Sequence, residues 1–107
     1  MEFQVRYTAK GIVFGNYWGG GKGGYATKRV NGNTLEELLS KAKEMLADGS
    51  LDDGMGYESL IGALLDVSII TTVIIDGKEF TNTEIETHFI GDLSEKEIDF
   101  LEECLSL

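Results

Sequence analysis

The feature that most constrains the fold is a long segment rich in β-branched and aromatic residues, DVSIITTVIIDGKEFTNTEIETHFIG, at positions 66–91. Residues of these types favour β-strands, in which successive side chains point to opposite faces. Asp76 and Gly77 interrupt the segment with a dipeptide that favours a tight reversal of the chain. The segment therefore predicts a β-hairpin with two long strands.

Two registers are open to this hairpin, and they differ in the face on which its acidic residues lie. A three-residue turn, with Gly77 at positive φ, puts one set of residues on one face (Val67, Ile69, Val73, Ile75, Ile85, Phe89) and another set opposite (Asn82, Glu84, Glu86, His88). A two-residue turn would place Glu84 and Glu86 on the face of Ile69 and Val73. We expect the three-residue turn, because it separates charged from apolar side chains.

Two helices and a second hairpin complete the predicted fold. FQVRYTAKGIVF and YATKRV are expected to be paired strands on either side of a glycine run, and YESLIGALL is expected to be a short helix or turn that leads into a strand. A capping box of Thr34 and Glu37 predicts a helix over 34–47, with Gly49 as its stop. Ser94 and Glu97 predict a second helix over 94–106, with an apolar stripe of Ile98, Leu101 and Leu105.

These elements predict a single α+β domain over residues 1–107, in the order ββαββα. We expect an antiparallel sheet made of two hairpins, with both helices packed on one face of the sheet. The chain of 107 residues is long enough to bury a core without staples. With one cysteine, Cys104, it can form neither an internal disulfide nor a cysteine metal cluster.

Charge is distributed unevenly along the sequence. The formal net charge is −10, which disfavours direct binding of nucleic acid because phosphates would be repelled. Residues 1–32 hold five basic side chains and one acidic side chain, whereas the remainder holds four basic and 18 acidic ones. Such asymmetry suggests an interaction surface, although acidity also serves solubility. No signal peptide or long apolar run is seen, so we expect a cytoplasmic protein that is not in a membrane.

The segment GNYWGGGKGGYATKRV at 15–30 is the first candidate site. Gly19, Gly21 and Gly24 match G-x-G-x-x-G, but a dinucleotide fingerprint needs a helix after the loop, and a strand is expected here. Three readings stay open: a plain hairpin tip, a nucleotide site and a protein contact. A nucleotide site would use these glycines, Lys22 and Tyr25, with an aromatic ring stacked on the base. A protein contact would use Tyr17, Trp18 and Lys22, with Trp18 as the energetic anchor.

The acidic residues near the C-terminus form the second candidate site. The candidates for partner binding are Glu84 and Glu86 in the hairpin and Glu97, Glu102 and Glu103 in the last helix. Carboxylates spaced along one surface can occupy sites on a partner that otherwise bind phosphates. Glu84, Glu86 and His88 could also form a row suited to a metal or to proton transfer, but a surface histidine is the commoner situation. We expect no catalytic residues, metal or cofactor.

Three segments together resemble the small acidic proteins encoded by bacteriophages and prophages: YWGGGKGGY, NTLEELLSKAKEMLADGSLDDGMGYESLIGALL and FIGDLSEKEIDFLEE. The resemblance implies a non-enzymatic protein acting in the bacterial host cytoplasm, of the anti-defence type that includes anti-CRISPR proteins. The function expected first is an inhibitor whose acidic surface imitates DNA and docks on the basic groove of a host protein. The alternatives are a nucleotide-signal sponge that uses the glycine loop and acts as a homo-oligomer, and a phage structural or housekeeping module.

Overall fold

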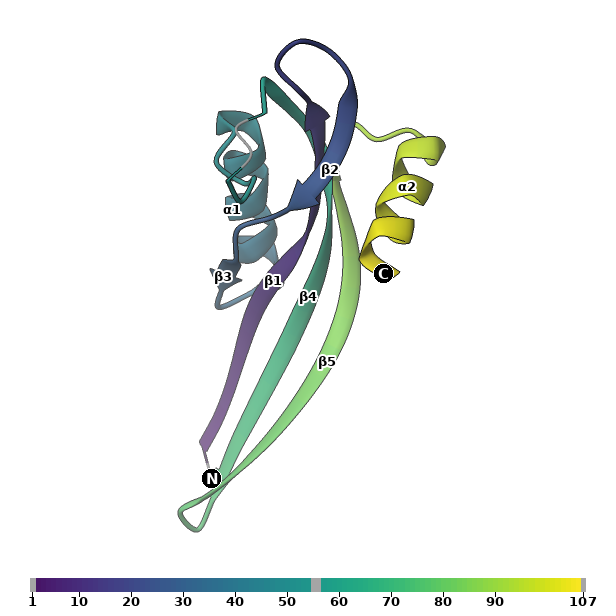
Figure 1. Cartoon of the computed structure of the whole chain (residues 1–107). Helices are drawn as coiled ribbons and strands as arrows, with labels where there is room; N and C mark the ends of the chain where they lie inside the picture. The colour runs from purple at the N-terminus through teal and green to yellow at the C-terminus, as the bar shows by residue number, and fades with distance from the viewer. Residues whose placement is uncertain (1, 55–56, 107) are drawn as a thin grey trace.

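The computed structural model describes residues 2–54 and 57–106, with side chains up to Cys104, and shows a five-stranded antiparallel sheet with two helices (Figure 1). The elements are β1 (Glu2–Asn16), β2 (Lys22–Ala26), β3 (Val30–Gly32), α1 (Leu35–Asp48), β4 (Ser59–Ile75), β5 (Lys78–Gly91) and α2 (Glu95–Ser106). The strand order is β2-β1-β4-β5, and β3 pairs with β1 next to β2. The α+β class is confirmed, in the order βββαββα.

The turn between β4 and β5 contains two residues, so the predicted three-residue turn is wrong. Ile75 pairs with Lys78, and Asp76 and Gly77 have φ of 51° and 77°. Both values are positive, as a type I′ turn requires, and this turn matches the right-handed twist of the strands. Glu84 pairs with Ile69, and Glu86 pairs with Val67, so each shares a face with its apolar partner. Both glutamates are exposed on β5, so the register buries neither charge.

The segment 59–65 belongs to β4, so the expected short helix or turn over 57–65 is wrong for most of its length. Ala63, Leu64 and Leu65 are consecutive and all buried. A continuous apolar run of this length is consistent with a strand that is covered on both faces. The local pattern had suggested a helix or turn because burial on both faces removes the alternation of polar residues.

The two helices cover opposite faces of the sheet, which corrects the expectation that both pack on one face (Figure 1). Leu38 and Ala42 of α1 belong to a core cluster with Leu65, which defines the α1 face of the sheet. Leu101 of α2 packs with Leu64, whose side chain lies on the other face of the sheet, which we call the α2 face. Because neighbouring residues of β4 are apolar, each face needs its own cover.

The N-caps are confirmed at both helices, and α2 has the complete capping box; at α1, Glu37 Oε2 accepts a hydrogen bond at 3.2 Å from the amide of Asn33, the residue before the cap. Thr34 Oγ1 accepts a hydrogen bond from the Glu37 amide at 3.0 Å, and Gly49 ends α1 with φ of 82°. The Ser94 amide donates to Glu97 Oε1 at 2.9 Å, and the Glu97 amide donates back to Ser94 Oγ at 3.3 Å. These contacts satisfy amides that the first helical turns leave without partners. Leu105, the last position of the predicted stripe, lies outside the described side chains.

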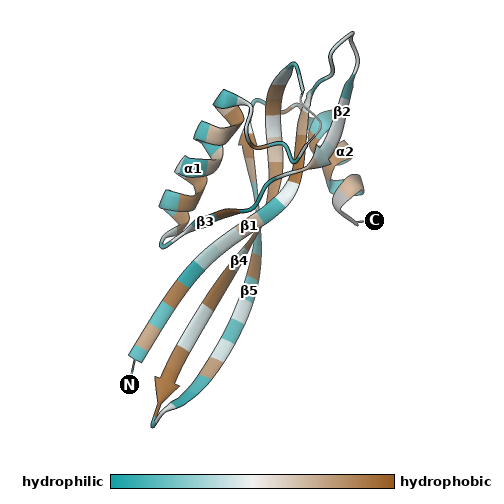
Figure 2. Ribbon diagram, turned by 60° about the vertical axis from the view of Figure 1, so that its left-hand side comes forward, coloured by the Kyte–Doolittle hydropathy of each residue, from teal (hydrophilic) through white to brown (hydrophobic). Residues whose placement is uncertain are grey.

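The molecule is elongated, with extents of 59 × 26 × 21 Å. β1, β4 and β5 continue past both helices as a three-stranded extension, which we call the arm (Figure 1). Figure 2 shows that β4 stays hydrophobic to the tip of the arm, whereas β5 beside it is mostly hydrophilic. Phe3 and Phe80 lie in one cross-strand row with Val73, and both phenylalanines are more than half exposed.

Candidate functional site

The glycine run forms the tip of the hairpin between β1 and β2. The Tyr17 amide donates to the Gly21 carbonyl at 3.1 Å, and the Gly20 amide donates to the Tyr17 carbonyl at 3.2 Å. Gly19, Gly20 and Gly21 all have positive φ, a conformation that glycine adopts without steric cost. Trp18 is 73% exposed at this tip. The loop joins two strands, which is the setting of a hairpin and not that of a dinucleotide fingerprint.

The aromatic residues of the loop have different environments. Tyr17 stacks on Tyr57, with 4.9 Å between ring centroids and an angle of 22°. A side chain at Gly23 would collide with the Tyr17 ring, so glycine is needed at that position. Burial of Tyr57, together with the neighbouring Tyr17 phenol, raises the pKa of Tyr57. Tyr17 therefore fixes the base of the hairpin, while Trp18 is left to solvent and Tyr25 is 44% exposed on β2.

The loop and α2 lie next to each other. Lys22 Nζ lies 3.8 Å from Glu97 Oε2, and the Glu97 side chain is only 19% exposed. The Ser94 amide, the Ser94 hydroxyl and the Lys22 ammonium together lower the pKa of Glu97, and the amide has the largest effect. Below this pair, Phe100 packs edge-on against Phe14 at 5.8 Å between ring centroids. The sheet and the pair together hold α2 beside the Trp18 hairpin.

The predicted acidic residues do not form one surface. Four carboxylates of α2 are exposed (Glu95, Asp99, Glu102, Glu103), and α2 lies on the α2 face. Glu84 and Glu86 project from the opposite face, because they pair with Ile69 and Val67. The structure thus brings Trp18 and Lys22 together with α2 and separates both from the glutamates of the hairpin.

Glu86 has a local partner in the polar row of β5. Its Oε2 lies 3.1 Å from His88 Nε2, and Glu84 occupies the next position of that face. Among the described residues, no group of three or more His, Cys, Asp or Glu side chains is arranged to hold a metal ion.

The residues proposed for nucleotide binding are partly engaged already. Lys22 is paired with Glu97, and the amide of Gly20 is used within the turn. Gly24 pairs with Phe14 in the strand ladder, where an added Cβ would crowd Ile12 and Phe100. Gly19 and Gly21 border open space. A nucleotide site at this loop stays a prediction.

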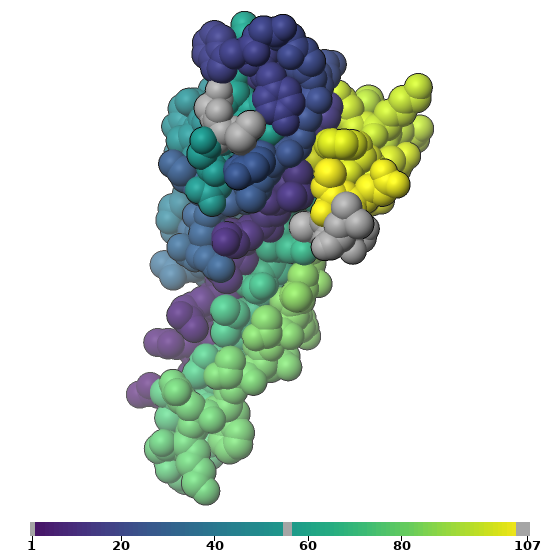
Figure 3. Space-filling model, viewed as in Figure 1, coloured from purple at the N-terminus to yellow at the C-terminus, as the bar shows by residue number. Residues whose placement is uncertain are grey.

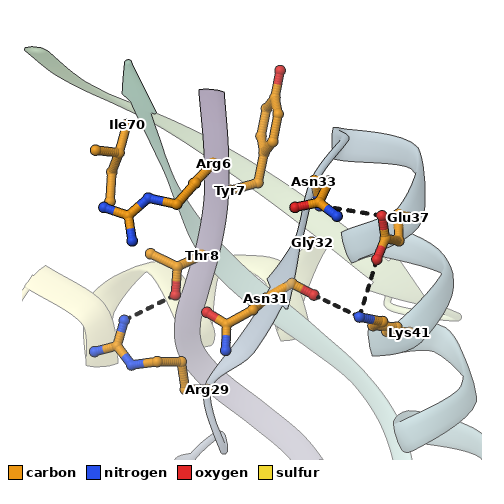
Figure 4. A pocket seen from close by; sticks show the side chains of 10 residues that line it. All are labelled: Arg6, Tyr7, Thr8, Arg29, Asn31, Gly32, Asn33, Glu37, Lys41 and Ile70. Carbon is orange, nitrogen blue, oxygen red and sulfur yellow. Dashed lines mark hydrogen bonds and ion pairs between the residues drawn. The ribbon is translucent and has the colours of Figure 1, made fainter. Parts of the chain in front are cut away.

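Sequence reasoning missed a pocket beside β3. An open pocket of about 540 Å³ lies where β3 meets β1 and the start of α1, and Arg6, Thr8 and Arg29 line one side of it (Figure 4). Lys41 lines the other side and is held there by Glu37 at 3.1 Å. The excess of basic residues in 1–32 was a visible signal, but only the pairing of β3 with β1 brings Arg29 beside Thr8.

Comparison with known proteins adds no relative: no family model, curated protein or solved structure matches this chain. Neither α1 nor α2, the helices of the described chain, combines the length and the apolar character needed to span a membrane.

Proposed function

We propose that this protein is a non-enzymatic, phage-encoded inhibitor that acts in the bacterial cytoplasm by docking on a basic groove of a host nucleic-acid-handling or defence protein. The observation that carries the proposal is the ion pair between Lys22 and Glu97. It holds the exposed Trp18 hairpin beside a helix with five acidic residues and one basic residue in its sequence. One end of the molecule thus offers an aromatic anchor and a row of carboxylates.

This end combines the exposed Trp18 with the carboxylates of α2. Figure 3 shows α2 standing out beside the β1–β2 hairpin, at the end of the molecule away from the β4–β5 turn. Glu95, Asp99 and Glu102 are exposed on α2. Carboxylates raised above the surface can approach the cations of a groove that normally bind phosphates, and they attract such a groove over long range.

Trp18 and the carboxylates contribute to different steps of binding. Attraction between charges steers the encounter and is screened by salt, since the Debye length falls from about 10 Å at 0.1 M to about 3 Å at 1 M. A buried tryptophan contributes mainly to the lifetime of the complex, because the packed contacts around it must break on release. Association should therefore depend on salt and on α2, and dissociation should depend on Trp18.

The test uses two double variants with the same change of charge. The first variant, Glu95→Lys with Glu102→Lys, reverses two charges of α2, one in the first turn and one seven residues later. The second variant, Glu36→Lys with Glu44→Lys, reverses two charges of α1, one in the first turn and one eight residues later. All four side chains are exposed, so neither pair should disturb the fold greatly. Glu97 is left intact because its side chain closes the capping box.

The partner is first captured from a bacterial lysate on immobilised wild-type protein, and its nucleic-acid binding is then measured while inhibitor is added. We expect the α2 pair to slow association and to relieve inhibition, the α1 pair to have little effect, and Trp18→Ala to speed dissociation. Equal effects of the two pairs would show that only net charge matters. If inhibition changes neither with salt concentration nor in the variant Glu95→Lys with Glu102→Lys, the proposal that α2 imitates nucleic acid is refuted.

A further inference from the structure

Three basic side chains gather on the α2 face of β1 in a protein with 19 acidic residues. Arg6, Thr8 and Lys10 alternate along β1, so their side chains share this face. Arg29 reaches across from the segment before β3, and its Nη1 donates to Thr8 Oγ1 at 3.0 Å. In Figure 4, Arg6 and Arg29 extend from the same side of β1 with Thr8 between them.

These cations lack the partners that the composition makes abundant. Within the described chain, the ion pairs join Lys22 to Glu97, Lys41 to Glu37 and His88 to Glu86. Neither Arg6, Lys10 nor Arg29 takes part in any of them. Because carboxylates outnumber basic groups by about two to one, cations that cluster without carboxylate partners need a reason, and an anionic ligand supplies one.

Two open pockets meet at this cluster. The pocket of about 540 Å³ includes Arg6 and Arg29, and a second of about 370 Å³ includes Lys10, Ser68 and Arg29. Both share Thr8 and Arg29, and each volume lies within the range of small-molecule sites. A ligand bound here would meet two guanidinium groups, one ammonium group and two hydroxyl groups within a short stretch of sheet.

We infer that the cluster of Arg6, Lys10 and Arg29 is a binding site for a small ligand that carries a phosphate or diphosphate group. Guanidinium groups match the geometry of phosphate oxygens through paired hydrogen bonds, and hydroxyls complete the set of donors. Asp66, opposite Lys10 in the ladder, offsets one of the three positive charges. A doubly charged anion therefore fits the cluster better than a single carboxylate does.

The site can bind an anion despite the overall negative charge. The edge strand β5 lies two strands away from β1, which is about 10 Å at the usual spacing between strands. That separation exceeds the Debye length of about 8 Å at physiological ionic strength. Two carboxylates line the pockets themselves: Glu37, which is paired with Lys41, and Asp66, so Arg6, Lys10 and Arg29 still leave an excess of positive charge. The inference does not depend on the proposed inhibitor function, which uses Trp18 and α2.

The experiment is calorimetric titration of the full chain with pyrophosphate, with ADP and with acetate as a singly charged comparator. We expect pyrophosphate and ADP to bind and acetate to bind far more weakly. Arg6→Gln and Arg29→Gln should each weaken pyrophosphate binding by about tenfold or more, the loss expected for a charged hydrogen-bond donor. Arg29→Lys keeps the charge but not the planar guanidinium group, so it should weaken pyrophosphate binding less than Arg29→Gln does. This variant also provides a second test of Arg29 if the glutamine variant fails to fold.

Lys22→Gln and Lys43→Gln are the matched controls, because neither side chain lines the two pockets, and both variants should bind pyrophosphate within about twofold of the wild type. Tighter binding of ADP than of pyrophosphate would identify a nucleotide as the ligand, and equal binding would identify the phosphate group alone; both support the site. Absence of binding, equal losses in the controls, or a preference for a single-stranded oligonucleotide over ADP would overturn it.

Discussion

Leu38→Ala and Leu101→Ala apply the same truncation to two separate cores and should give different outcomes. Both leucines are fully buried, Leu38 in the large cluster under α1 and Leu101 in the small cluster under α2. The α1 cluster contains ten buried residues, whereas the α2 cluster contains three. We expect Leu38→Ala to destabilise the whole domain and Leu101→Ala to release α2 from the sheet.

The cost of each truncation follows from the carbon groups that are removed. Each buried methylene or methyl group contributes about 0.8 kcal/mol, and the cavity left behind adds to the loss, which gives about 2.5–4 kcal/mol for Leu38→Ala. In a domain of this size, that loss should lower the midpoint of thermal unfolding by roughly 10–20 °C. For Leu101→Ala, the loss cannot exceed the free energy that docks α2, because beyond that point the helix detaches.

Thermal unfolding and hydrogen exchange distinguish the two outcomes. In Leu38→Ala, protection should fall throughout β1, β4 and α1. In Leu101→Ala, the amides of α2 should lose protection while those of β4 keep theirs, and the unfolding midpoint should move less. An equal shift of the midpoint in the two variants, with uniform loss of protection, would show that α2 belongs to the main cooperative unit and would refute this division of the core.

Three shorter predictions concern the turn, the cap and the loop. Gly77→Ala should cost about 1–2 kcal/mol in urea unfolding, because Gly77 has φ of 77°; an unchanged free energy would contradict the type I′ turn. The folded pKa of Glu97 lies below its ordinary value of 4.5, so its contribution to stability is full above that pH and is lost as the pH falls through the folded pKa. Glu97→Gln should therefore flatten stability against pH below about 4.5. Trp18 is the sole tryptophan, so acrylamide should quench its fluorescence almost as in the free amino acid, and strong protection would contradict its exposure.

Local signals predicted the parts of the fold that depend on local physics. The caps at Thr34 and Ser94 were correct, because capping is decided within four residues of sequence. The register at Asp76 was not, since the expectation required every glutamate to avoid an apolar face. A glutamate must avoid an apolar face only where a helix covers that face. Whether α1 covers Glu84 depends on tertiary packing, which a local sequence pattern does not reveal.

The candidate sites show the same limit. The exposure of Trp18 could be foreseen, because no amphipathic pattern buries a tryptophan at the start of a glycine run. The contact of Lys22 with Glu97 joins residues 75 positions apart, and it exists only because α2 folds back over β1 near the hairpin. Arg6 and Arg29 are likewise brought together by the pairing of β3 with β1. Net charge indicated a basic region but not its geometry.

The acidic residues of β5 and those of α2 need different explanations. β5 is a long, exposed edge strand, and edge strands with free backbone groups tend to pair with other chains unless charges keep those chains away. Charges at Glu84 and Glu86 can protect this edge, so their presence does not require a binding partner. α2 has no free edge, since its backbone is hydrogen-bonded within the helix, so protection of an edge does not account for its carboxylates. The acidity that remains to be explained lies on α2 next to Trp18, and for this reason we propose α2, and not the hairpin, as the docking surface.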